Sequence, residues 1–177
     1  MPSRRQFLQT ALAAPFAAAL TANAFAAETQ PALKLKKAVK YDMIQIKGTV
    51  KEKFDLVKSL GFEGVEFDSP SEIDRDAAVA AQRDTGVKIH GVIDSVHWQK
   101  RLSDPDPAVR AAGLDALKIA IADAKFYGAT SILLVPGRVD AKTGESFDEC
   151  WSRSQEEIKK VLPLVADSGA RLAIEAV

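Results

Sequence analysis

The sequence predicts an α/β fold in which parallel strands alternate with helices. Short β-rich, apolar runs alternate five times with longer amphipathic segments, and this is the pattern of consecutive βα units. Each amphipathic segment ends at a glycine just before the next apolar run, at Gly61, Gly86, Gly128 and Gly169. One βα unit per cycle therefore repeats along the chain.

The apolar runs are the predicted strands. They cover residues 38–44, 64–67, 87–93, 131–135 and 171–176. Short runs of this composition, bounded by turn residues, are typical of strands, and the longer segments between them supply the crossovers that parallel strands need.

Start signals precede three of the predicted helices. Thr49 and Ser146 are each followed three residues later by a glutamate, which is the pattern of a capping box. The longest helix is predicted to start near Asp106, with a proline in its first turn, and to run to Gly128. The helix after Ser146 is predicted to reach Leu164.

Parallel βα units build either an open doubly wound sheet or a closed barrel. Residues 46–49 (IKGT) follow the first strand in place of a glycine-rich phosphate fingerprint, which counts against a dinucleotide-binding fold. We therefore expect a partial (β/α)8 barrel, strands one to five of eight. Because a complete barrel typically takes about 250 residues, we expect the natural product to continue beyond Val177 and this chain to be an N-terminal fragment.

Residues 1–27 are interpreted as a twin-arginine signal peptide. Residues 3–8 (SRRQFL) carry the paired arginines, an apolar stretch covers 11–20, and Ala24 and Ala26 suit signal peptidase. A membrane anchor is disfavoured because spanning a bilayer takes roughly 20 apolar residues. We expect residues 28–177 to form the barrel part. The mature protein should be exported to the periplasm by the twin-arginine machinery, without stable membrane association.

The composition argues against several partners and sites. Lys plus Arg and Asp plus Glu both number 24, so the chain lacks the basic excess that nucleic-acid binding needs, and no nucleic-acid partner is expected. The single cysteine, Cys150, excludes an internal disulfide and a multi-cysteine metal site within the chain. Its helical setting predicts a small core residue.

A set of motifs occurs in an ordered series after the leader. They are GFEGVEF at 61–67, HGV at 90–92, SVHW at 95–98, DPD at 104–106, YGAT at 127–130, LLVPG at 133–137 and LAIE at 172–175. In this order they resemble the sugar phosphate isomerase/epimerase family, the xylose isomerase-like TIM barrels that include hydroxypyruvate isomerase and tagatose epimerase relatives.

The resemblance implies a divalent metal at the carboxyl mouth of the barrel, held by Glu, Asp, His and Glu from four later strands. Only Glu175 matches this set, and Ala176 follows it where relatives commonly have Asn. The family pattern makes Glu175 both a metal ligand and a catalytic acid or base, whereas the alternative is a glutamate that caps an exposed strand end. Ligands of this kind favour Mn, Mg or Co, with Zn also possible.

The implied chemistry explains the need for a carboxylate. Interconverting an aldose and a ketose, or inverting the carbon beside a carbonyl, removes a weakly acidic proton and forms an enediolate. A metal serves as Lewis acid while carboxylates move the proton. In full-length form we expect a metal-dependent isomerase or epimerase of a sugar, sugar phosphate or hydroxypyruvate-type substrate. The fragment alone is expected to be inactive.

Four residues are weaker candidates for contacts with the sugar. Glu66 and His90 are expected to end the second and third strands at the mouth, although an ion pair or a structural role is an open alternative. His97 and Trp98 follow in the next loop, where an indole suits the apolar face of a sugar and an imidazole suits its hydroxyls.

Other interpretations remain open. A non-catalytic carbohydrate-binding barrel would keep the pocket and lack the metal set, and the sequence does not separate it from an enzyme. A related multi-zinc endonuclease would need more histidines than two and a basic face. Asp68, Asp94 and Arg138 are interpreted as solvated loop residues. An oligomer is also possible.

Overall fold

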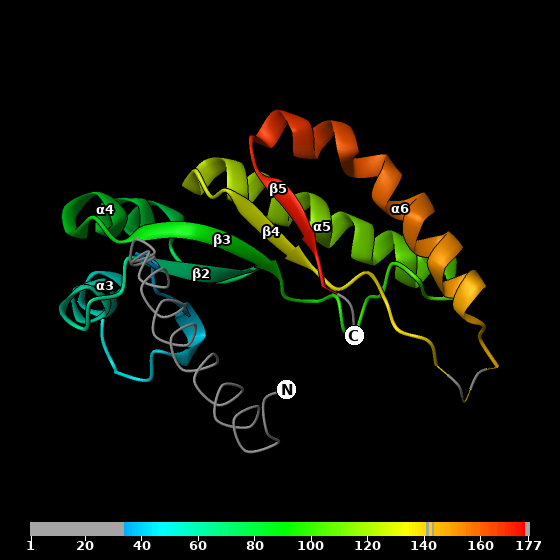
Figure 1. The fold of residues 1–177 in the computed structure, drawn as a ribbon, viewed down its shortest axis with the longest axis horizontal. Helices are drawn as coiled ribbons and strands as arrows, with labels where there is room; N and C mark the ends of the chain where they lie inside the picture. The colour runs from blue at the N-terminus through cyan, green and yellow to red at the C-terminus, as the bar shows by residue number, and fades with distance from the viewer. Residues whose placement is uncertain (1–33, 141, 143, 176–177) are drawn as a thin grey trace, which may run out of the picture. The chain divides into compact units, whose positions relative to one another are not determined.

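The computed structural model describes residues 34–140, 142 and 144–175. In this part of the chain, five parallel strands form one sheet in the order β1-β2-β3-β4-β5, and Figure 1 shows β2 to β5 in this order. The strands are β1 (Ala38–Lys40), β2 (Gly64–Ser69), β3 (Lys88–Asp94), β4 (Ser131–Leu134) and β5 (Arg171–Ile174). The predicted parallel α/β fold is confirmed. The predicted leader at 1–27 lies outside the described residues.

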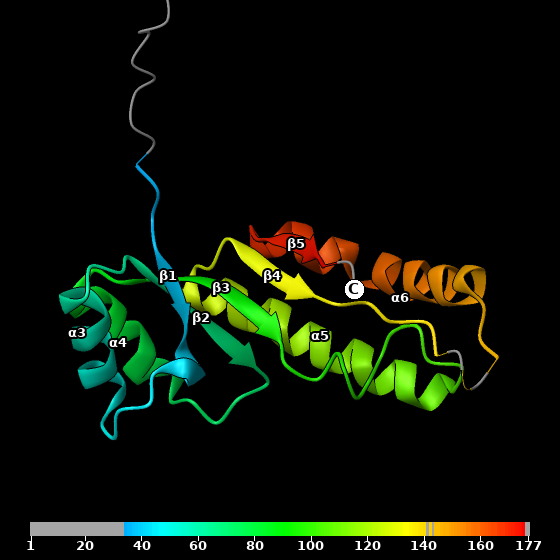
Figure 2. The ribbon, with the colours of Figure 1, turned by 60° about the horizontal axis from the view of Figure 1, so that its bottom comes forward.

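Four helices connect successive strands after β1 (Figure 2). They are α3 (Val50–Ser59), α4 (Arg75–Thr85), α5 (Pro107–Tyr127) and α6 (Phe147–Ser168). The capping boxes at Thr49 and Ser146 are both present, and the Asp106 carboxylate caps α5 by accepting the N–H of Ala108. No described helix has the length and apolar character to traverse a lipid bilayer.

Several element boundaries differ from the prediction, most of all the end of β1 and the end of α6. β1 stops at Lys40, because Tyr41–Met43 form a short 3-10 helix (η1) that turns the Tyr41 ring against Phe67, with ring centroids 4.8 Å apart. At the other end of the chain, α6 continues past Leu164 to Ser168 although it contains Pro163, and Val165 is buried in the core. In both places packing, which the local pattern does not encode, sets the boundary.

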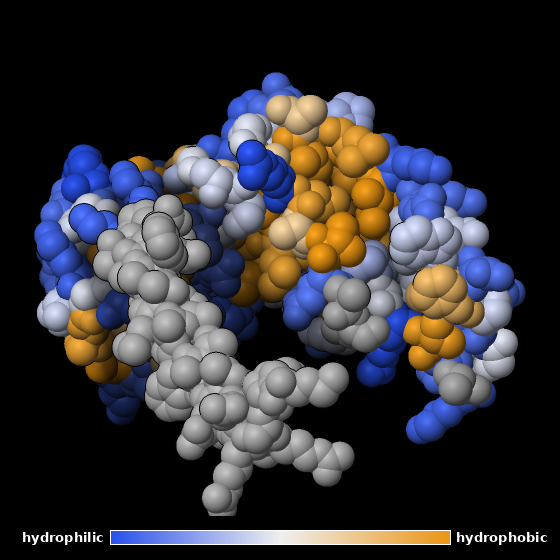
Figure 3. Space-filling view, viewed as in Figure 1, coloured by the Kyte–Doolittle hydropathy of each residue, from blue (hydrophilic) through white to orange (hydrophobic). Residues whose placement is uncertain are grey.

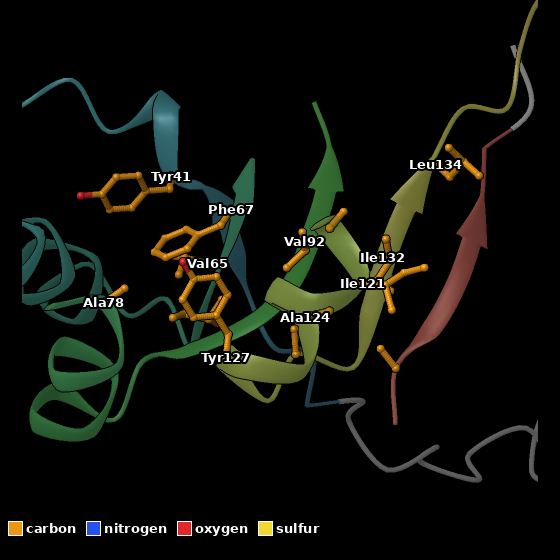
Figure 4. Close-up of a cluster of buried hydrophobic side chains, with 14 of the residues drawn as sticks. Tyr41, Val65, Phe67, Ala78, Val92, Ile121, Ala124, Tyr127, Ile132 and Leu134 are labelled. Atoms are coloured by element: carbon orange, nitrogen blue, oxygen red, sulfur yellow. The ribbon is translucent and has the colours of Figure 1, made fainter. Parts of the chain in front are cut away.

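A single hydrophobic cluster joins the helices to one face of the sheet. Figure 4 shows Phe67 of β2 meeting Tyr41 and Tyr127, and the Phe67 and Tyr127 ring centroids are 5.3 Å apart at 90°. Residues alternate along a strand, so Glu66 and Asp68 point to the opposite face. Cys150 is buried, which confirms the core position predicted for it.

The opposite face of the sheet is partly apolar at β4 and β5. Hydrophobic side chains gather in Figure 3 where these strands lie in Figure 1. Leu133 of β4 is half-buried there, and Ala173, its partner in register on β5, is exposed. Polar residues of β1 and β2 therefore share the sheet with an apolar surface on the later strands.

Candidate functional site

The residues that follow the strands meet along one edge of the sheet. All strands are parallel, so their carboxyl ends lie side by side, and in β/α barrels this edge carries the active site. We call it the carboxyl edge. It includes Asp42, Asp68 near the end of β2, the loop 95–106, the described residues of the loop 135–146, and Glu175.

Glu175 lies at the carboxyl edge directly after β5. Its backbone N–H donates to the carbonyl oxygen of Leu134 at 3.0 Å, so the ladder between β4 and β5 extends to this residue. Alternation along the strand puts Glu175 on the same face as Ala173, whose partner in register is Leu133. Its side chain is exposed at the edge where the sequence predicts it.

Lys40 joins two acidic residues at the same edge. Its ammonium nitrogen lies 2.9 Å from Asp42 Oδ2 and 3.2 Å from Asp68 Oδ2. The hydrogen bond to Asp42 is the largest cause of a raised Lys40 pKa, and Asp68 adds to it. The interpretation of Asp68 as a solvated loop residue is wrong, because Asp68 lies within β2 and its carboxylate forms an ion pair with Lys40 of β1.

His97 is almost fully buried, at 5% exposure. Its Nδ1 accepts the backbone N–H of Val135 at 3.3 Å, so the proton of the neutral ring resides on Nε2. Burial is the main cause that lowers its pKa, while the negative charges of Glu175 and Asp68 oppose that shift. His97 thus belongs to the same electrostatic environment as both carboxylates.

Trp98 is the exposed neighbour of His97. Its indole is 45% exposed and stands nearly perpendicular to the imidazole, with ring centroids 5.2 Å apart. An exposed ring next to a buried one leaves an apolar surface open at the carboxyl edge. This arrangement suits the wall of a sugar site, as the sequence predicts.

Glu66 and His90 do not end their strands, contrary to expectation. β2 continues to Ser69 and β3 to Asp94, so both residues lie inside strands. The register pairs Val65 with Ile89 and Glu66 with Gly91, which makes His90 the extra residue of a β-bulge. Residues 64–67 of the motif GFEGVEF and the motif HGV at 90–92 do lie in strands, as predicted, but they do not indicate at which residue each strand ends.

The two side chains form a pair away from the carboxyl edge. Nε2 of His90 lies 3.8 Å from Oε1 of Glu66, which is too long for a hydrogen bond. Within the described residues this nitrogen is buried and has no hydrogen-bond partner. His90 lines a hollow of about 900 Å³ with Lys88 and Gly128, at the amino ends of the strands. A substrate contact for Glu66 or His90 stays a prediction.

Asp94 is a residue whose character the sequence interpretation missed. It ends β3, is 1% exposed, and accepts the backbone N–H of Val96 at 3.3 Å. Burial raises its pKa to about 6, while the hydrogen bond from Val96 acts in the opposite direction. A carboxyl group three residues before His97 is therefore buried, not solvated. The sequence signal that could have predicted the burial of Asp94 is its position at the end of an apolar strand.

The described residues alone do not fit a divalent metal. Among them there is no group of three or more His, Cys, Asp or Glu side chains that could bind one. Asp68 is paired with Lys40, and His97 uses Nδ1 for the backbone of Val135. Glu175 supplies one carboxylate, whereas these ions take several oxygen ligands from protein or water. With Glu175 as the single protein ligand, most of the coordination sphere would fall to water.

Comparison with protein families gives one clear match. Residues 54–177 match the sequence profile of the xylose isomerase-like TIM barrel family. Among curated proteins, the L-ribulose-5-phosphate 3-epimerase UlaE of Salmonella paratyphi B is 31% identical over 136 residues, which are 70% of this chain and 47% of that protein. The chain thus spans about half the length of the curated relatives it matches.

Solved structures show the same fold. The 3-keto-D-glucoside 4-epimerase YcjR of E. coli superposes with a TM-score of 0.68 at 18% identity, covering 81% of this chain and 57% of that one. An L-ribulose 3-epimerase gives 0.65 at 18% identity, over 80% and 50% of the two chains. The D-psicose 3-epimerase of Clostridium cellulolyticum H10, solved with D-tagatose, gives 0.65 at 19%, over 81% and 53%.

Proposed function

Because the chain belongs to the xylose isomerase-like TIM barrel family, we propose that it is part of a sugar isomerase or epimerase. The observation that carries this proposal is the position of Glu175 at the carboxyl edge, in the same local field as the buried His97. The four relatives named above are epimerases of a ketose phosphate, a ketose or a keto-sugar, and their names support the substrate class. The activity is proposed for the whole protein that contains these residues.

Glu175 would move the proton. An exposed carboxylate at the carboxyl edge can accept the proton from the carbon beside a carbonyl, which leaves an enediolate on the substrate. Returning that proton to the adjacent carbon gives isomerisation. Epimerisation needs a second acid on the other side of the same carbon, and the described residues do not assign that group.

His97 and Trp98 would hold the sugar. The Nε2–H of His97 is a donor for a hydroxyl or carbonyl oxygen, because its Nδ1 is engaged by Val135. The exposed face of Trp98 would cover the apolar C–H face of the ring. A neutral donor and an aromatic wall recognise a polyol without requiring a charge on it.

Metal dependence and export are part of the proposal. Glu175 would contribute one carboxylate to a divalent ion, with Mn, Mg or Co preferred and Zn an alternative. The paired Arg4 and Arg5 support export by the twin-arginine route. In a host with the twin-arginine machinery, the mature protein should reach the periplasm. In a host that lacks this machinery, the precursor should stay in the cytoplasm.

Proton transfer at carbon is the direct test. The longest product of the gene, without residues 1–27, is incubated with ketohexoses and ketopentoses in D2O, and deuterium at the carbon beside the carbonyl is followed by NMR. We expect exchange and a new isomer or epimer, with kcat lowered on the order of 100-fold to 10,000-fold in Glu175→Gln. Elemental analysis should find about one divalent metal per chain in the wild type and a lower metal content, or none, in Glu175→Gln.

The control is Glu156→Gln, which removes an exposed carboxylate from the middle of α6. It should behave as wild type. A folded protein that binds ketoses, holds no divalent metal and exchanges no deuterium would favour the non-catalytic carbohydrate-binding barrel. Full activity in Glu175→Gln would remove Glu175 from the mechanism.

A further inference from the structure

Glu145 is a buried carboxylate between two loops of the carboxyl edge. Its side chain is 3% exposed, and its Oε2 accepts from Nη1 of Arg101 at 3.5 Å and from the N–H of Asp140 at 3.0 Å. Its Oε1 accepts from Nη2 of Arg153. One carboxylate therefore lies between guanidinium groups from the loop 95–106 and from α6.

The same two arginines also hold the backbone of the loops. Arg101 donates to the carbonyl oxygen of Arg138 at 2.6 Å and pairs with Asp104 at 3.1 Å. Arg153 donates through Nε to the carbonyl oxygen of Ser103 at 2.7 Å. Each loop is thus bound by a side chain from outside it, and Glu145 is the acid that both arginines share.

These contacts continue toward His97. The N–H of Ser103 donates to the carbonyl oxygen of Pro136 at 3.2 Å, and the N–H of Val135 donates to His97. The contact between His97 and Val135 therefore joins the two loops near the start of each loop. The contact between Arg101 and Glu145 joins them further along. The loop that carries His97 and Trp98 cannot move far without breaking one of these contacts.

We propose that Glu145 is a positioning residue that fixes the loop 95–106, and with it His97 and Trp98, against the loop 135–146. The proposal rests on the proposed sugar site. Without the carboxylate, Arg101 and Arg153 would face each other at 11% and 21% side-chain exposure with their shared counter-charge gone. Two poorly solvated positive charges repel, so the loop 95–106, which carries Arg101, would move away from α6, which carries Arg153. It would at the same time lose the contact with the loop 135–146 that Glu145 provides.

The expected kinetic signature separates positioning from catalysis. Glu175 directly follows β5 and lies on neither loop, so the chemical step should survive while the binding of the sugar weakens. In the mature protein, Glu145→Gln should raise KM for the ketose on the order of 10-fold and change kcat much less. Glu145→Asp keeps the charge and should lie nearer to wild type, and Glu156→Gln is the matched control on α6.

Hydrogen–deuterium exchange measured by mass spectrometry tests the same inference without activity. In Glu145→Gln, peptides covering 95–106 and 135–146 should exchange faster, while peptides from β2 and β3 should stay unchanged. If Glu145→Gln does not fold, Arg153→Lys replaces it, because lysine keeps the charge but cannot reach both Glu145 and Ser103 in the same geometry.

The outcomes are separable. A protein that turns over no ketose contradicts the proposed function, yet faster exchange in both loops would still support the role of Glu145. Unchanged loop exchange in Glu145→Gln, or a KM that stays at the wild-type value in an active enzyme, would overturn the positioning role. A loss of kcat as large as the rise in KM would also overturn it.

Discussion

The backbone N–H of Val135 donates to Nδ1 of His97 at 3.3 Å, and this bond joins the loop after β3 to the end of β4. A nitrogen that accepts a hydrogen bond carries no proton, so the neutral ring must be protonated at Nε2. The strand end therefore determines which nitrogen of His97 is available as a donor at the carboxyl edge.

We predict that His97 is neutral at pH 7, with its proton on Nε2. Burial lowers its pKa below the ordinary value of 6.5, so between the two values the unfolded state binds more protons and stability falls as the pH drops below 6.5. Long-range ¹H–¹⁵N NMR gives the tautomer and the titration midpoint, with His90 as the second histidine for comparison. A proton on Nδ1, or a midpoint above 6.5, would contradict this.

Asp94 should act on stability in the opposite direction. Its pKa is raised from 3.8 to about 6, so the folded state holds a proton that the unfolded state releases, and stability falls as the pH rises from 4 to 6. Asp94→Asn can still accept the N–H of Val96 and carries no charge. At pH 7 it should be more stable than wild type by up to about 3 kcal/mol.

Urea unfolding at pH 4 and pH 7 measures the effect of Asp94→Asn. The gain should be present at pH 7 and should nearly vanish at pH 4, where the wild-type carboxyl is protonated. Asp115→Asn, whose side chain is 71% exposed, is the control and should show no such dependence. An equal change at both pH values would show that the substitution alters packing and not ionisation.

The order and type of the elements were accessible from the sequence because local signals agreed with tertiary packing. The capping boxes at Thr49 and Ser146 and the left-handed glycines such as Gly86 are encoded by single residues, and the structure has them. Strand ends were not accessible in this way. Tyr41 leaves β1 because its ring packs on Phe67, a contact between residues far apart in the sequence.

The candidate site was predicted less completely than the fold. Glu175 and Trp98 lie where strand order and loop position predict, since both follow directly from the βα pattern. His90 was placed wrongly because it is the extra residue of a β-bulge and four further strand residues follow it. Asp94 and Glu145 were not identified, because the burial of a carboxylate depends on partners that no local motif displays.

Gly137 should tolerate no side chain, because its backbone lies against Ser103 of the other loop. A Cβ at this position would lie 2.0 Å from Ser103 Oγ and 2.4 Å from Ser103 Cβ. Gly137→Ala should therefore destabilise the fold by about 1–3 kcal/mol, since neither loop can withdraw without breaking the contacts around Glu145.

The free energies of unfolding in urea of wild type, Gly137→Ala, Ser103→Gly and the double variant form a double-mutant cycle. The double variant should recover most of the loss, because the atoms that clash are gone. If the effects of the two substitutions were simply additive, the loops would separate at low cost in free energy. That result would contradict a rigid contact between the loops 95–106 and 135–146.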